Sequence, residues 1–186
     1  MDTNHETIYH KALFAYTEKM PCKTIEVNGK PYLRRYFKKQ HEDGSQEWLH
    51  QFLSADGERH IHSHPWAAVS TILCGGYTEE YEFTLRPGKQ QITLRTGDKN
   101  VITPDRLHRI IEVHGHCWTH MLVSAERLDT WHFINEAGEK EIMQTSKPDW
   151  WRHELTRNGI EAKINLMFRV QGELLEHYQN GSILKV

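Results

Sequence analysis

Helical spacing of apolar residues is confined to the start of the chain. Tyr9, Leu13 and Phe14 recur at near-helical intervals, which predicts a helix over residues 4–20 that Pro21 ends. After Pro21, short runs that are apolar or alternate in polarity are separated by glycine and proline turn signals. The predicted strands cover residues 23–27, 32–37, 48–53, 67–73, 77–85, 91–94, 101–102, 108–113, 118–123 and 131–134, with a turn expected at Cys74-Gly75-Gly76. Many short strands in succession predict an all-β protein, an antiparallel sandwich or barrel.

We expect a single domain over residues 1–186, because this length suffices for one hydrophobic core. Residues 48–133 form the expected core, and residues 4–40 contribute the N-terminal helix and a hairpin. The C-terminal extension, residues 136–186, begins with an aromatic-anchored loop over 147–151. Its later strand-like runs cover residues 164–170, 173–178 and 183–184. This extension is either a meander added to the core or an arm that forms a dimer, and the sequence leaves both open.

Charge and composition exclude several classes of protein. The net charge of −2 gives no electrostatic footprint for nucleic acid. No apolar run approaches the length of a membrane span, and the first residues lack the pattern of a signal peptide. Cys22, Cys74 and Cys117 are too few and too widely spaced for a disulfide framework or a thiolate zinc site. We therefore expect a reduced, cytoplasmic protein that binds neither nucleic acid nor membrane.

Candidate chemistry concentrates in the stretch His60-Ile61-His62-Ser63-His64-Pro65-Trp66. Neutral imidazole is the commonest protein ligand for borderline divalent metals. On an extended strand, side chains two residues apart share a face, so His62 and His64 would aim at one point with His60 behind them. Two neighbouring imidazoles do not complete a site, so a further ligand must come from elsewhere in the chain. The competing interpretation is that these histidines are polar surface residues of a loop.

The order of motifs around this stretch resembles the cupin superfamily. The matching positions are Gly57, His62, His64 and Gly75-Gly76 for the family's first motif, and Gly97, Pro104 and His108 for its second. Two histidine motifs in the right order are a stronger signal than either alone. The resemblance implies a double-stranded β-helix, or jelly-roll barrel, in which His108 joins His62 and His64 at a metal ion. The family's glutamate ligand would fall at Ala68 or Val69, so this chain departs from the pattern there.

A three-histidine site resembles that of the cupin thiol dioxygenases, which hold ferrous iron. The resemblance therefore implies a mononuclear non-haem iron dioxygenase or hydroxylase with Fe(II) and a small-molecule substrate; zinc, nickel and manganese are the alternative metals. Three neutral imidazoles leave open positions at the metal, whereas a structural site needs a fourth protein ligand. His120 is the candidate for a fourth ligand or for a hydrogen-bond partner of a ligand. A metal-binding cupin without redox chemistry, such as an isomerase, a lyase or a small-molecule sensor, is the other function left open.

Three further residues are candidates for catalytic roles in the same pocket. Arg106, in the loop before His108, can bind a substrate carboxylate through two hydrogen bonds. Glu112 shares a strand face with His108 and is a candidate proton acceptor, or else a cap on the barrel rim. Tyr77 is a candidate for the pocket wall, although aromatic residues of small barrels are more often core. Arg109 is expected on the opposite face, in a surface ion pair. The family also makes a homodimer an option.

Overall fold

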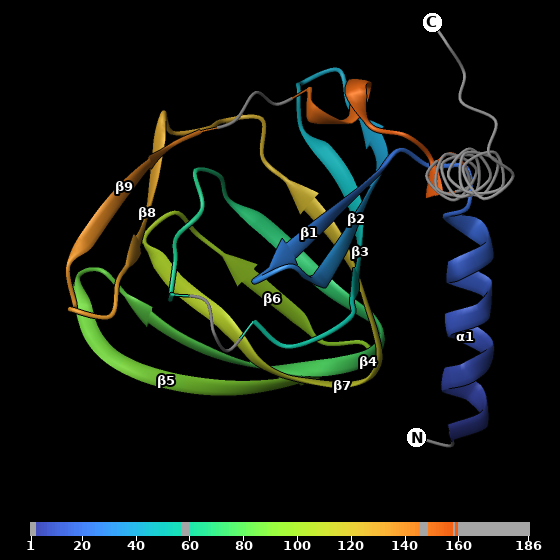
Figure 1. The fold of residues 1–186 in the computed structure, drawn as a ribbon, viewed down its shortest axis with the longest axis horizontal. Coiled ribbons are helices and arrows are strands. Elements are labelled where there is room, and N and C mark those ends of the chain that lie inside the picture. Colours follow the sequence, from blue (N-terminus) through green and yellow to red (C-terminus); the bar gives the residue numbers. More distant parts are fainter. Residues whose placement is uncertain (1–2, 57–59, 146–148, 158, 160–186) are drawn as a thin grey trace, which may run out of the picture.

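The computed structural model of the protein describes residues 3–56, 60–145, 149–157 and 159. Its elements are α1 (Thr3–Tyr16), β1 (Cys22–Val27), β2 (Lys30–Gln40), β3 (Gln46–Phe52), β4 (Ala68–Phe83), β5 (Arg86–Arg95), β6 (Lys99–Ile102), β7 (Arg106–Val123), β8 (Thr130–Ile134), β9 (Lys140–Gln144) and the short 3-10 helix η1 (Trp150–His153). Strands enclose the body of the molecule, and α1 stands beside it (Figure 1). The predicted all-β class with an N-terminal helix is confirmed. The strands predicted beyond residue 160 lie outside the described residues.

One antiparallel ladder folds over on itself, because the long strands β4 and β7 take part in both of its halves. In the first half, residues 68–72 of β4 pair with residues 119–123 of β7, with β6 on one side and β3, β2 and β1 on the other. In the second half, residues 76–83 of β4 pair with β5 and with residues 106–114 of β7. The segment around His62 extends this half by bridging β7 and β8, and β9 pairs with β8. The two halves face each other as the predicted jelly roll.

The fold-over depends on bends within β4 and β7. A turn was predicted at Cys74-Gly75-Gly76, and this prediction is wrong, because β4 continues through these residues with register shifts on either side of Cys74. Gly75 has a φ of +64°, and a Cβ there would lie 2.6 Å from the carbonyl oxygen of His114. Gly115, with a φ of +62°, lies in the corresponding bend of β7, which joins two strands that were predicted separately. Glycine adopts positive φ at little cost, so Gly75 and Gly115 allow the two strands to bend at these positions.

Apolar side chains pack in clusters between the halves and beneath α1. Trp48 lies in a buried cluster with Phe37 and Trp66, and the ring of Trp151 stacks on Phe37 with centroids 4.1 Å apart. The predicted aromatic anchoring near residue 150 is thereby confirmed. On the outer side, α1 packs against a second buried cluster that includes Trp118. Within the described ranges, no helix has the length and apolar character needed to cross a bilayer.

Candidate metal centre

The segment from His60 to His64 lies between β7 and β8 and is tied to both. The backbone of His62 exchanges two hydrogen bonds with that of His108, at 3.1 and 2.8 Å between nitrogen and oxygen. On the other side, the Ser63 N–H donates to the carbonyl oxygen of His132 at 2.8 Å. The first histidine motif therefore lies directly beside the second, although the two are far apart in the sequence.

His62, His64 and His108 converge. One ring nitrogen of each lies within 4.8 Å of those of the other two, and the Nε2 atoms of His64 and His108 are 2.7 Å apart. His62 Nδ1 donates to the carbonyl oxygen of His60 at 3.2 Å, which assigns the lone pair to Nε2. The ring of His64 stacks on Trp66 with centroids 4.2 Å apart. Packing and backbone bonds thus hold the three rings around one point.

This set of side chains fits a divalent metal ion. Imidazole nitrogens bind zinc at about 2.0–2.1 Å, so two ligands of one ion lie at most about 4.2 Å apart. The ring nitrogens here lie within 4.8 Å of one another, which is close to that spacing. His62 and His108 are buried, whereas His64 is half-buried. Among the described residues, no further histidine, cysteine or acidic side chain joins the group. Three protein ligands leave positions for other molecules, which is the arrangement of a catalytic rather than a structural site.

The three histidines line a cavity of about 210 Å³ between the two halves of the ladder. Most of its wall is apolar, with a small number of polar groups, as in small-molecule sites generally. The wall includes the aromatic residues Tyr32, Phe52, Trp66, Tyr77 and Trp131 and, besides the cluster, the polar residues Arg35, His50, Asp56, Ser70 and Arg109. A small organic molecule in this space would lie against the cluster.

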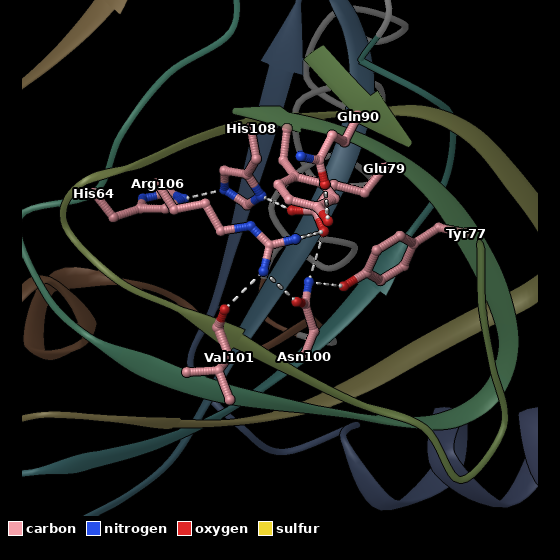
Figure 2. A network of polar contacts seen from close by, with 9 residues as sticks. His64, Tyr77, Glu79, Gln90, Asn100, Val101, Arg106 and His108 are labelled. Atoms are coloured by element: carbon pink, nitrogen blue, oxygen red, sulfur yellow. Dashed lines mark hydrogen bonds and ion pairs between the residues drawn. The ribbon is translucent and has the colours of Figure 1, made fainter. Parts of the chain in front are cut away.

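A buried polar network lies behind His108 (Figure 2). Glu79 is 0% exposed; one carboxylate oxygen accepts a hydrogen bond from His108 Nδ1, and the other accepts from Arg106 Nη2 at 2.8 Å and Asn100 Nδ2 at 2.7 Å. Burial acts to raise the pKa of the Glu79 carboxyl, but His108 and Arg106 outweigh it and bring that pKa below its ordinary value. An ionised carboxylate only accepts, so His108 carries its proton on Nδ1 and presents Nε2 to the cluster.

Arg106 was predicted to bind a substrate carboxylate, and the structure places it elsewhere. Its side chain is buried in the network, where Nη1 donates to Asn100 Oδ1 and to the Val101 carbonyl oxygen, both at 2.8 Å. Its guanidinium lies 4.1 Å from the centre of the Tyr81 ring, and it is not among the residues that line the cavity. The predicted role is wrong because the buried anion Glu79 takes this cation as its partner.

Tyr77 does line the cavity, as predicted, and its catalytic role stays a prediction. Its hydroxyl oxygen accepts a hydrogen bond from Asn100 Nδ2 at 3.1 Å. Burial first and the charge of Glu79 second raise the pKa of Tyr77, so that the phenol keeps its proton. Arg109 forms the expected ion pair, with 2.9 Å between Nη2 and Glu80 Oε1, and it also lies among the residues that line the cavity.

Glu112 and His120 point away from the cluster, which corrects both assignments. Glu79 pairs with Ile110 while Thr78 pairs with Glu112, so β7 carries one extra residue here and the faces of the strand exchange. The Glu112 side chain is consequently 65% exposed. His120 lies on the outer face of β7, where its Nε2 is 2.8 Å from Glu47 Oε2. Neither residue belongs to the site.

Glu79 is the site residue that sequence reasoning did not single out. It lies between Tyr77 and Tyr81, and alternation along a strand puts it on the same face as these two aromatic residues. An acid on an otherwise apolar, inward face is costly unless it is paired. This pattern could have drawn attention to Glu79 from the sequence, but it does not indicate which residue pairs with it.

Both histidine motifs meet inside one barrel of antiparallel strands, which is what the resemblance implied. The chain has a cupin fold. Neither a protein-family model nor a curated protein matches the sequence. Among solved structures with this fold, the cupin-2 domain protein Rru_A2000 of Rhodospirillum rubrum is 16% identical, with a TM-score of 0.47 over 64% of this chain and 78% of that one.

Two further solved structures contain iron. FeII HppE is 10% identical, with a TM-score of 0.47 over 57% of each chain. Streptomyces albus HEPD, with 2-hydroxyethylphosphonate and Fe(II) bound, is 11% identical, with a TM-score of 0.49 over 57% of this chain and 24% of that one. This chain therefore spans less than two thirds of either protein, and likenesses of this size transfer neither ligand nor activity to the cupin barrel described above.

Proposed function

We propose that the protein is a mononuclear non-haem iron dioxygenase or hydroxylase that acts on a small molecule in the cavity. The observation that supports it best is the convergence of His62, His64 and His108 at the cavity wall, with no fourth ligand among the described residues. Three neutral imidazoles leave a bound divalent ion its full charge and several open positions. Fe(II) held there would supply the activation of dioxygen.

The protein's own residues bind and orient the substrate in this proposal. Trp66 and Trp131 form an apolar wall beside the histidines, which excludes water from the reacting end of a small molecule. Tyr77 keeps its proton and lines the same space, and Asn100 holds its hydroxyl in place. Arg35 and His50 supply further polar groups on the wall. The cavity can thereby fix both an apolar and a polar part of one molecule.

The test begins with anaerobic purification and measurement of bound metal. The protein is then loaded with Fe(II), and oxygen consumption is followed with a panel of thiols, amino acids and keto acids. We expect substrate-dependent oxygen uptake that His64→Ala abolishes and the matched variant His120→Ala retains, because His120 lies outside the cluster. Tightly held zinc or nickel with no oxygen uptake across the panel would refute the oxygenase and support the cupin without redox chemistry.

A further inference from the structure

The first motif has no carboxylate at Ala68 or Val69, but a buried carboxylate, that of Glu79, contacts one histidine of the cluster. Ala68 is buried, on the inward face of β4, and offers no donor atom. Further along the same strand, Glu79 contacts His108 on the side of the ring away from His64 (Figure 2). The site therefore combines three imidazole side chains with a buried carboxylate in contact with one of them.

We propose that Glu79 is a positioning residue of the metal centre: it holds the His108 ring with Nε2 towards the metal and makes that nitrogen a stronger ligand. This inference rests on the proposed metal site. A carboxylate that accepts the second N–H of a ligating histidine fixes the tautomer and orientation of the ring and raises its basicity. Glu79 accepts such a hydrogen bond from Nδ1 of His108.

The carboxylate is itself fixed from two further strands. Glu79 comes from β4, its partner Asn100 from β6, and Arg106 from the start of β7. Arg106 is held in turn by the Asn100 side chain and the Val101 carbonyl oxygen, and by the ring of Tyr81 beneath it. A rotation of the carboxylate would break contacts on both of its oxygens, so the orientation of His108 is built into the packing of the barrel.

A purely structural ion pair between Glu79 and Arg106 is the competing explanation. Such a pair would stabilise the barrel through its two charges and would leave the ligand strength of His108 unchanged. Glu80 offers a matched control, because it is the next residue of β4, is also an acid, and is paired with Arg109 and Lys89 rather than with a histidine of the cluster. Glu80→Gln removes an ion pair from the same strand without touching a histidine of the cluster.

The first experiment titrates metal-free protein with Co(II) and with Zn(II). We expect Glu79→Gln to bind both ions about 10- to 100-fold more weakly than wild type, the range typical for the loss of such a partner. The visible absorption of the Co(II) complex should also shift, because the field of one ligand changes. Glu80→Gln should match wild type in affinity and spectrum. Equal affinity and an unchanged spectrum for a folded Glu79→Gln would overturn the proposal.

The second experiment uses the wild-type chain and does not depend on the variant folding. Nitrogen-15 NMR of the histidine rings, in metal-free and Zn(II)-loaded protein, identifies which nitrogen of His108 carries the proton. We expect the proton on Nδ1 in both states. A proton on Nε2 in the metal-free protein, or zinc bound through Nδ1, would overturn the role of Glu79. Failure of wild type to bind either ion would instead count against the proposed metal site, and the metal-free spectrum would still test the contact.

Discussion

The cavity wall contains a further buried imidazole, His50, which should make the fold sensitive to mild acid. His50 is 4% exposed, and its Nε2 accepts a hydrogen bond from Arg35 Nε at 3.2 Å. Burial first and the neighbouring guanidinium second lower the pKa of His50 well below its ordinary value of 6.5. The folded protein therefore keeps this ring neutral at a pH where the unfolded chain protonates it.

The sign and size of the effect follow from proton linkage. As the pH falls below 6.5, the unfolded state takes up a proton at His50 that the folded state does not, so the free energy of unfolding decreases. The slope approaches about 1.4 kcal/mol per pH unit for one proton. Between pH 7 and pH 5 the loss amounts to about 2 kcal/mol, provided that the ring stays neutral in the fold. This is a sizeable share of the stability of a typical domain.

Urea denaturation of metal-free protein at pH 7 and at pH 5 measures this loss directly. We expect wild type to lose about 2 kcal/mol more than His50→Gln between the two conditions, because the variant has no proton to take up at this position. His153→Gln, which replaces an exposed histidine, should behave as wild type does. Contributions from other histidines are common to all three proteins and cancel in the comparison. An identical pH dependence for His50→Gln and wild type would refute the reasoning.

Three shorter predictions concern the bend, an excluded residue and the ligands. Gly75→Ala should lower the free energy of unfolding by more than about 1 kcal/mol in urea denaturation, because its Cβ would meet the His114 carbonyl oxygen; Gly29→Ala, also at positive φ but with nothing within 4 Å, should cost less. Glu112→Gln should leave the affinity for Zn(II) unchanged in a titration, and a tenfold loss would contradict its outward position. Free Zn(II) at 100 times its dissociation constant should stabilise wild type by about 2.7 kcal/mol in thermal melting. Neither the His62→Ala variant nor wild type with an excess of a zinc chelator should show this gain in stability.

Features that depend on near neighbours were predictable from the sequence. Alternating polarity placed most strands within a few residues of their observed bounds, because burial on one face repeats every second residue. The same period placed His62 and His64 at one point. His108 came from the family resemblance, and the backbone pairing of His62 with His108 explains why the two motifs meet.

The error at Glu112 has a physical cause in the strand itself. A parity argument assumes an unbroken strand, and β7 contains an inserted residue and a bend between His108 and its C-terminal half. Each irregularity changes which residues face inward, and the sequence marks the bend only by Gly115, which resembles an ordinary turn signal. Because bulges depend on the pairing partner, a single strand read alone does not reveal them.

Arg106 and Glu79 could not be paired in advance, because the pairing is a property of the register between two long strands. Tyr81 pairs with His108 and Glu79 with Ile110, so Glu79 reaches His108 diagonally across the ladder. The register is regular over this stretch, and the extra residue of β7 falls on the far side of Glu79, towards the bend. The irregularity that curves the ribbon is thus kept out of the segment that aligns the carboxylate with its histidine. A shift by one residue in that segment would turn Glu79 outward and leave Arg106 buried without its anion, so the stability of the barrel and the geometry of the candidate site select the same register.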